Sequence, residues 1–312
     1  MPTMYSYYSR QFTHTCRGAG NRTRAARSQS AYTTIMLHPV SLAHLCCVLV
    51  DENVPLFGRH RYNAPMDTET SENARSYDDH ADGWFRSMPT NPGHIYIEKP
   101  AMDGALPEDL TGIRVLSVGT GSGEELSMLI KRNPRHIIAI DISEKLLDIA
   151  RRSYPDLECH TMDMMDLSFP DASFGLVYSS LAFHYAKDWD TLLKGVFRVT
   201  RPGGILLFST HHPGYWSKGA TGAAHTNERG ITLTEHEAVL PGGVHIVYYN
   251  HKDTSSLRDA VENAGFIIET LQEPAVVTQK NLPLREKKRY ENMVVTNAKT
   301  PLFHVIRARR PQ

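Results

Sequence analysis

Short apolar segments alternate with amphipathic ones along residues 113–209, and few folds accommodate that pattern. The apolar segments have the length of buried strands, while the amphipathic segments show helical spacing of their apolar residues. The strands are expected at 113–118, 136–141, 157–162, 174–180 and 205–209, and the helices at 124–131, 144–152 and 189–199. This alternation predicts an α/β fold with a doubly wound, mostly parallel sheet.

Residues 211–252 break this rhythm directly after the fifth expected strand. Segments 231–240 and 244–249 are joined by Pro-Gly-Gly, which is typical of a hairpin. An insertion at this point lies over the carboxyl ends of the strands, where open α/β folds bind ligands. We therefore expect the hairpin to form a small lid over the substrate. The pattern also predicts helices at 73–88 and 255–264, and strands at 266–271 and 303–307.

The first 66 residues show neither helical nor strand periodicity and are expected to be a disordered extension of a domain that spans 67–312. The first fifty contain five Arg and no Lys, Asp or Glu, a composition typical of a mitochondrial transit peptide. An upstream extension of the reading frame, with the useful start at Met66, accounts for the same composition. The sequence does not choose between these two interpretations.

The rest of the chain argues against nucleic-acid and membrane partners. From residue 51 onward 34 acidic residues stand against 29 basic ones, the opposite of a phosphate-binding surface. The most apolar run, 35–50, is shorter than the roughly 20 residues that span a bilayer. Four cysteines supply no disulfide framework and no paired metal-ligand spacing. We expect a soluble, cytoplasmic protein without a metal, or a mitochondrial one if the extension is a transit peptide.

Three glycines, Gly119, Gly121 and Gly123, follow the first expected strand and precede a helix. Glycine at such a turn allows the backbone to bend sharply and to approach a ligand closely. The G-x-G-x-x-G pattern of dinucleotide sites would place its third glycine where Glu124 stands, and a carboxylate there repels a pyrophosphate. Asp141 ends the second strand, where such folds bind ribose hydroxyls with an acid. A helix-capping role explains Asp141 as well, but the glycine loop favours the ribose role.

Four segments, in this order, resemble class I S-adenosylmethionine-dependent methyltransferases: VLSVGTGSG, AIDISEKLLDIAR, MDMMDLSFPDASFGLVYSSLAFHY and RVTRPGGILLFST. The resemblance is to the small-molecule group that includes ubiquinone and menaquinone C-methyltransferases, and it covers roughly residues 77–309. It implies a Rossmann-like sheet of seven mostly parallel strands with an antiparallel last strand. It also implies S-adenosylmethionine as the cofactor and a small-molecule methyl acceptor, whose identity and methylated atom the sequence does not reveal.

The resemblance assigns the cofactor to a set of residues: Gly119, Thr120, Gly121, Gly123, Asp141, Ile142, Asp163, Met164, Ser179 and Ser180. In this assignment the glycine loop cradles the methionine part of the cofactor, and Asp141 binds the ribose. Asp163 and the Met164 amide contact the adenine edge. Ser179 and Ser180 lie beneath the sulfonium.

Ser117 departs from the pattern of the related family, which usually has an acid at this position. That acid helps to order the methionine amino group, so its replacement by a hydroxyl is expected to weaken the hold on the cofactor. Tyr96, or Tyr77 on the preceding helix, is expected to cover the cofactor instead.

His184 and His212 are the candidate catalytic residues. In-line displacement at a sulfonium requires the protein to align the acceptor, exclude water and, where the acceptor carries a proton, remove it. Both histidines follow expected strand ends that face the cofactor, so either is placed to take or orient that proton.

Three other functions compete with this interpretation, and one of them, an NAD-dependent oxidoreductase, is disfavoured by Glu124. A nucleic-acid methyltransferase is disfavoured because the fourth strand runs into Ser-Ser-Leu-Ala at 179–182, not into the Asn/Asp-Pro-Pro-aromatic signature of amino-methylating enzymes. A non-catalytic, cofactor-binding regulatory subunit is favoured only by Ser117. The oligomeric state does not follow from the sequence.

Overall fold

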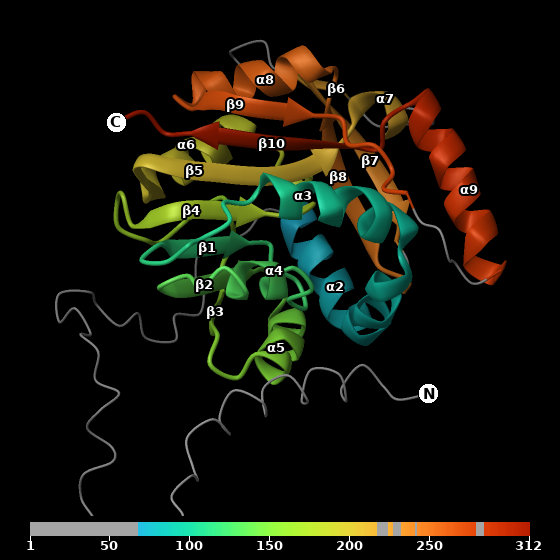
Figure 1. The fold of residues 1–312 in the computed structure, drawn as a ribbon, viewed down its shortest axis with the longest axis horizontal. Coiled ribbons are helices and arrows are strands. Elements are labelled where there is room, and N and C mark those ends of the chain that lie inside the picture. The colour runs from blue at the N-terminus through green and yellow to red at the C-terminus, as the bar shows by residue number, and fades with distance from the viewer. Residues whose placement is uncertain (1–67, 217–223, 227–231, 241, 279–283) are drawn as a thin grey trace, which may run out of the picture. The chain divides into compact units, whose positions relative to one another are not determined.

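The computed structural model describes residues 68–216, 224–226, 232–240, 242–278 and 284–312 (Figure 1). The expected N-terminal extension lies outside these residues. Within the described part of the chain, no helix is both long enough and apolar enough to cross a membrane.

One seven-stranded sheet organises the fold, in the order β3-β2-β1-β4-β5-β10-β9 (Figure 1). Its strands are β1 (Arg114–Val118), β2 (His136–Asp141), β3 (Glu158–Thr161), β4 (Phe174–Ser179), β5 (Thr200–His211), β9 (Ile267–Gln272) and β10 (Phe303–Arg309). β10 runs antiparallel to both of its neighbours, and the strands from β3 to β5 pair in parallel. The expected fold with an antiparallel last strand is therefore confirmed.

Helices cover both faces of this sheet. The helices of the described residues are α2 (Thr68–Ser87), α3 (Lys99–Ala105), α4 (Leu126–Ile130), α5 (Glu144–Ser153), α6 (Trp189–Val199), α7 (Pro213–Trp216), α8 (Thr254–Asn263) and α9 (Leu284–Lys299), with short turns η1 (Met88–Thr90), η2 (His94–Glu98) and η3 (Phe183–Tyr185). Successive residues of a strand point to opposite faces. Val177 and Leu206 accordingly pack in the core formed with α6 and α8, whereas Leu176 and Leu207 pack in the core formed with α3 and α4.

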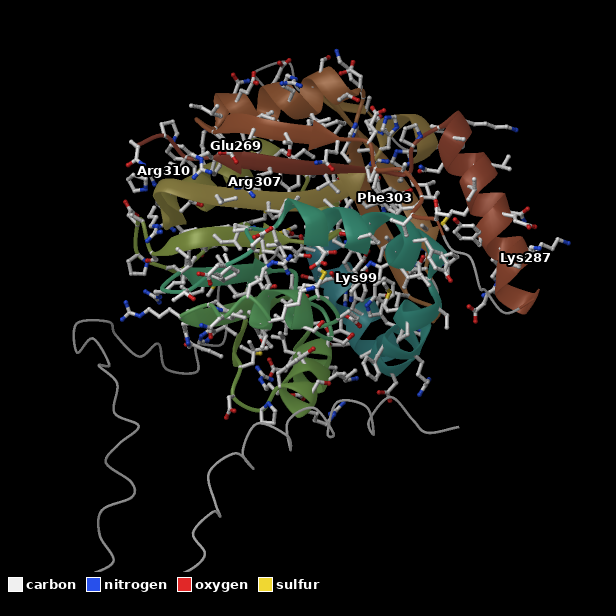
Figure 2. The ribbon with its side chains drawn as sticks, viewed as in Figure 1. Lys99, Glu269, Lys287, Phe303, Arg307 and Arg310 are labelled. Carbon is white, nitrogen blue, oxygen red and sulfur yellow. The ribbon has the colours of Figure 1, made fainter. Side chains whose placement is uncertain are left out.

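β2 and α6 have the bounds that the sequence predicts, but β5 begins earlier, at Thr200. Residues 201–204, which lie between the expected helix at 189–199 and the expected strand at 205–209, belong to the strand because the C-terminal segment supplies partners for their backbone groups. The Gly203 N–H donates to the Arg310 carbonyl, and the Arg310 N–H donates to the Gly204 carbonyl. On the other side of β10, Arg307 Nε donates to Glu269 of β9 at 2.7 Å (Figure 2).

The segment expected as a lid contains a second, three-stranded antiparallel sheet, β6-β7-β8. Its strands are β6 (Ala224–Thr226), β7 (Thr232–Val239) and β8 (His245–His251), so the predicted hairpin is confirmed and gains one strand. In Figure 1 it lies at the end of the main sheet toward which the β4 and β5 arrows point. Asn73 joins this small sheet to α2. The Asn73 amide nitrogen donates to the Val247 carbonyl, and the Asn73 amide oxygen accepts the Val247 N–H, both at 2.8 Å.

The sequence pattern does not predict η2, α3 or α9. Pro100 and Gly104 in α3 are poor residues for a helix interior, and α9 begins with a basic run that reads as a solvated surface. The structure shows what holds them: the Tyr290 ring of α9 packs edge-on against Tyr96 at 5.2 Å, and Met293 is buried beside it. These contacts position one wall of the cavity described next.

Candidate functional site

A cavity of about 680 Å³ opens at the carboxyl ends of β1, β2 and β4. Its walls come from α2, from the segments that follow β1, β2, β3 and β4, and from α9. A volume of this size is typical of sites for small molecules and cofactors. The position agrees with the general rule that open α/β sheets bind ligands beyond the carboxyl ends of their strands.

The glycine loop forms the floor of this cavity. Gly119 has a φ angle of +65°, and a Cβ atom there would lie 2.3 Å from the Ala182 Cβ. Gly121, with a φ angle of +55°, donates its N–H to Asp141 Oδ2 at 2.7 Å. Gly123 does not line the cavity; a Cβ there would meet Leu126 at 3.0 Å, so this glycine allows the loop to pack against its own helix.

Asp141 is placed by β2 at the rim of the glycine loop. One carboxylate oxygen accepts the Gly121 N–H, and the other accepts the Ser143 N–H at 2.9 Å. Burial raises the pKa of this carboxyl group, although the backbone N–H groups partly oppose the rise. Ser143 itself caps α5, because its hydroxyl accepts the Leu146 N–H. Asp141 thus orders the loop as well as lining the cavity.

Beyond Asp141, the cavity is lined by Ile142, Asp163, Met164 and Ser180, as the resemblance implies. Asp163 is buried, and its Oδ1 accepts the Met165 N–H at 2.8 Å, which fixes the turn that follows β3. Ser179, in contrast, is fully buried and does not line the cavity. Tyr77 of α2 lines it, whereas Tyr96 faces α9, so of the two tyrosines only Tyr77 is placed to cover a ligand.

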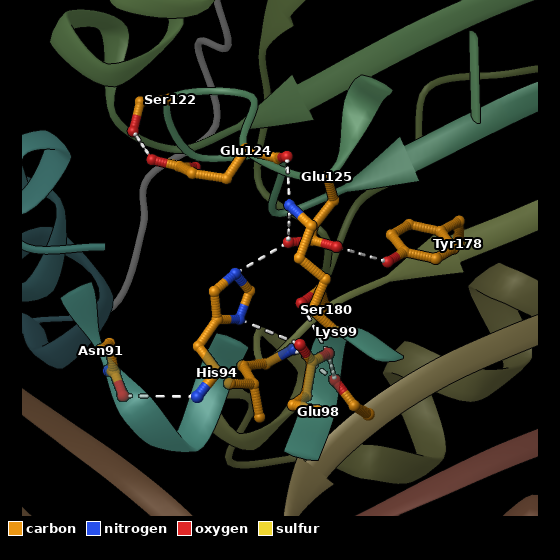
Figure 3. Close-up of polar contacts among 11 residues, drawn as sticks. Asn91, His94, Glu98, Lys99, Ser122, Glu124, Glu125, Tyr178 and Ser180 are labelled. Atoms are coloured by element: carbon orange, nitrogen blue, oxygen red, sulfur yellow. Dashed lines mark hydrogen bonds and ion pairs between the residues drawn. The ribbon is translucent and has the colours of Figure 1, made fainter. Parts of the chain in front are cut away.

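A buried charge network forms the opposite wall (Figure 3). His94 lies between two carboxylates: its Nδ1 is 3.0 Å from Glu98 Oε2, and its Nε2 is 2.8 Å from Glu125 Oε1. Lys99 Nζ is 3.4 Å from the same Glu125 oxygen. Burial disfavours a charged imidazole, but the hydrogen bonds and charges of Glu125 and Glu98 outweigh it and raise the pKa of His94 to about 10. His94 is therefore a cation at neutral pH.

The same network reaches β4 and β5 through hydroxyl groups. Ser180 Oγ and Ser209 Oγ both donate to Glu98 Oε1, at 2.8 and 2.6 Å, and Ser209 Oγ accepts the Leu181 N–H. Sequence reasoning missed His94 and Glu98, whose only signal is a spacing of four residues. A π-helical turn such as η2 is rare and frequently marks a functional site.

Two stacked imidazoles form the far end of the cavity. The rings of His184 and His211 lie 4.1 Å apart, and the Tyr248 ring stands edge-on to both. Burial lowers the pKa of His184 to about 3 and the pKa of His211 well below its ordinary value. Both rings are consequently neutral at physiological pH. The Tyr77 and Tyr185 hydroxyls share a hydrogen bond of 2.5 Å beside them.

His212 lies outside this cavity. The Gly214 N–H donates to its Nδ1 at 3.0 Å, so Nε2 carries the proton and points at Glu273 Oε1, 3.3 Å away. His304 Nε2 lies 3.6 Å from the same oxygen, and the His212 and His304 rings pack 4.5 Å apart. The expectation that His212 meets the acceptor is therefore not supported, because its ring is turned toward β9 and β10, whereas His184 does line the cavity.

Residues 116–208 match a protein family described as "methyltransferase domain". A malonyl-[acyl-carrier protein] O-methyltransferase of Yersinia pestis is 32% identical over 140 residues, which are 45% of this chain and 48% of that protein. An uncharacterized protein of Haemophilus influenzae is 31% identical over 137 residues, 41% of this chain and 53% of that protein. The aligned part thus spans about half the length of these curated relatives.

A solved structure shares the fold as well. The S-adenosylmethionine-dependent methyltransferase of Mesorhizobium loti is 28% identical, with a TM-score of 0.53. The match covers 68% of this chain and 96% of that one. The similarity therefore extends over nearly the whole of the related protein.

Proposed function

Because residues 116–208 form a class I S-adenosylmethionine-dependent methyltransferase domain, we propose that the whole chain transfers a methyl group to an uncharged, largely apolar small molecule. The observation that supports this acceptor class is the neutral, aromatic end of the cavity. When bound, the cofactor supplies a methyl group already activated on a sulfonium, so the chain's own task is to align the acceptor and exclude water.

The cavity fits S-adenosylmethionine in three respects. Gly119 lets the loop pass close to Ala182, where a Cβ atom would collide at 2.3 Å, and both residues line the cavity. Asp141 offers a buried carboxylate to a pair of hydroxyls. Asp163 and Met164 stand at the end where an adenine edge would be recognised.

Replacing Asp141 with alanine is expected to weaken cofactor binding about 5- to 150-fold, the effect of losing a buried hydrogen bond worth about 1–3 kcal/mol. Calorimetric titration with S-adenosylhomocysteine measures the change. Asp259→Ala on the exposed face of α8 is the matched control and should bind as the unaltered chain does. An Asp141→Ala variant with unchanged affinity would refute the ribose assignment.

The charges around the cavity argue against an anionic acceptor. Among the described residues that line it, the cations are His94, which is held between two carboxylates, and Lys187, whose Nζ is 3.3 Å from Glu69 and 5.9 Å above the Tyr249 ring. A malonyl group, named for several curated relatives, carries a carboxylate that would need a cation when buried. The neutral His184 and His211 rings do not supply one.

We assign His184 to the acceptor. Its Nδ1 is buried and has no hydrogen-bond partner among the described side chains and backbone. A hydroxyl or amine group of the methyl acceptor would supply the missing hydrogen bond. With a pKa of about 3 the ring is too weak a base to carry a proton at neutral pH. His184 therefore orients the acceptor, and its protonation does not limit turnover between pH 5 and pH 8.

The proposed function is tested with purified protein, methyl-labelled S-adenosylmethionine and a fractionated pool of small molecules from cells. Label is expected in apolar, uncharged products, identified by mass spectrometry, and not in carboxylate esters, nucleic acid or protein. With the identified acceptor, His184→Ala is expected to lower turnover by about 10- to 100-fold. This loss is smaller than the 10²–10⁴-fold effect of removing a true general base.

Cofactor affinity is the control in this assay, because His184→Ala should leave it nearly unchanged. His212→Ala, outside the cavity, should retain full turnover. Label found mainly in RNA or in carboxylate esters would contradict the proposed acceptor class, and cofactor binding without any label transfer would favour a regulatory subunit.

A further inference from the structure

Five carboxylates line the cavity, and four of them have defined partners. Asp141 and Asp163 accept backbone N–H groups as described above. Asp188 caps α6, where it accepts the Thr191 N–H and hydroxyl. Glu125 is paired with two cations. The fifth is Glu124, whose side chain has a hydroxyl partner but no cation within ion-pair distance among the described residues.

The Glu124 carboxylate accepts a hydrogen bond from the Ser122 hydroxyl, and no described lysine, arginine or histidine lies within ion-pair distance of it. Figure 3 shows it on the side of the glycine loop that points away from Glu125 and Lys99. One oxygen lies over Gly121, 3.7 Å from where a Cβ would stand. Burial raises the pKa of Glu124, which is the expected response of a carboxylate that lacks a counter-ion.

The neighbouring charges are balanced without Glu124. Two cations, His94 and Lys99, stand among the two carboxylates Glu98 and Glu125, so this network is neutral as a whole. Ser117, at the end of β1, offers a hydroxyl that donates to Thr120 at 3.1 Å and adds no charge. Negative charge at the loop therefore resides on Asp141, which is held by backbone N–H groups, and on Glu124. A half-buried carboxylate without an ion-pair partner favours a ligand that brings a cation.

We propose that Glu124 binds the α-ammonium group of the methionine part of S-adenosylmethionine, taking the place of the acid that is missing at Ser117. This inference rests on the cofactor assignment in the proposed function. An ammonium group offers three donors to the carboxylate oxygens, and it meets Glu124 directly over the backbone of Gly121. Glu125, already shared by His94 and Lys99, keeps its structural role.

The test compares two ligands by calorimetric titration: S-adenosylhomocysteine, and its analogue in which hydrogen replaces the amino group. Glu124→Gln is expected to lower affinity for S-adenosylhomocysteine about 10- to 150-fold, the range of a charge-assisted hydrogen bond. The same variant should bind the deaminated analogue within about twofold of the unaltered chain, because that ligand has no cation to lose. Glu108→Gln, exposed and remote from the cavity, is the matched control for both ligands.

Three outcomes would overturn the proposal: an equal loss for both ligands in Glu124→Gln, no loss for either, or a selective loss in Glu125→Gln and not in Glu124→Gln. The titration of the unaltered chain distinguishes a failure of the Glu124 proposal from a failure of the cofactor assignment on which it rests. If the unaltered chain bound neither ligand, the cofactor assignment would fail and Glu124 with it. If it bound both equally well, only the role of Glu124 would fail.

Discussion

Replacing His94 with leucine is expected to lower the free energy of unfolding near pH 7 by about 3–5 kcal/mol, because it leaves Glu98 and Glu125 buried without their shared cation. The loss should appear as a decrease in melting temperature of roughly 6–20 °C for a domain of this size. Differential scanning calorimetry measures it. His245→Leu on the exposed end of β8 is the control, and it should change the melting temperature little.

The His94 contribution has a defined pH dependence. The pKa of His94 is about 10 in the folded chain, above its ordinary value of about 6.5 in the unfolded one. Because the folded pKa is the higher, the stabilisation is fully present below pH 6.5 and is lost as the pH rises toward 10. The difference in stability between the unaltered chain and His94→Leu should shrink over that interval. A difference that stayed constant from pH 6 to pH 10 would show that His94 is not charged in the folded chain.

Replacing Gly119 with alanine is expected to lower cofactor affinity roughly 10²- to 10³-fold. The added Cβ would lie 2.3 Å from the Ala182 Cβ, and alanine is strained at a φ angle of +65°. Overpacking costs about 1–3 kcal/mol and the unfavourable φ angle about 1 kcal/mol, so the loop must move relative to Ala182. Both residues line the cavity, so this movement changes its shape. Titration with S-adenosylhomocysteine checks the result.

Gly112→Ala separates the two causes. Gly112 has a similar φ angle, +76°, but a Cβ there meets nothing within 4 Å. This variant should lose stability from strain alone and bind the cofactor normally. If Gly119→Ala bound as well as Gly112→Ala, close approach of the loop to Ala182 would not shape the site.

The parts of the fold that could be predicted are those whose cause is local. β2 and α6 have the expected bounds because apolar periodicity and a capping residue act within a few positions: the Asp188 side chain accepts the Thr191 N–H at the start of α6. The glycine loop and Asp141 could also be predicted, since strand ends and turn residues fix where they meet. Each of these features depends on neighbours in the sequence.

What could not be predicted depends on partners far along the chain. The extension of β5 back to Thr200 requires Arg310, and η2 is held by Glu125, by Ser180 directly after β4 and by Ser209 of β5. His184 and His212 both follow strand ends, so sequence alone placed them alike. Tertiary contacts separate them: His184 stacks on His211 inside the cavity, whereas His212 faces Glu273 outside it.

The bond between Asn73 and Val247 also matters for any redesign of acceptor preference. It joins residues 174 positions apart, and around it Tyr77 and Ala81 of α2 share one apolar cluster with Ile246 of β8. Helix α2 and the hairpin after β5 thus form one structural unit, although they come from two distant stretches of the sequence. Asn73 bonds main-chain groups that any hairpin offers, but the apolar face of α2 has to match the side chains of β8. The two stretches therefore have to be exchanged together.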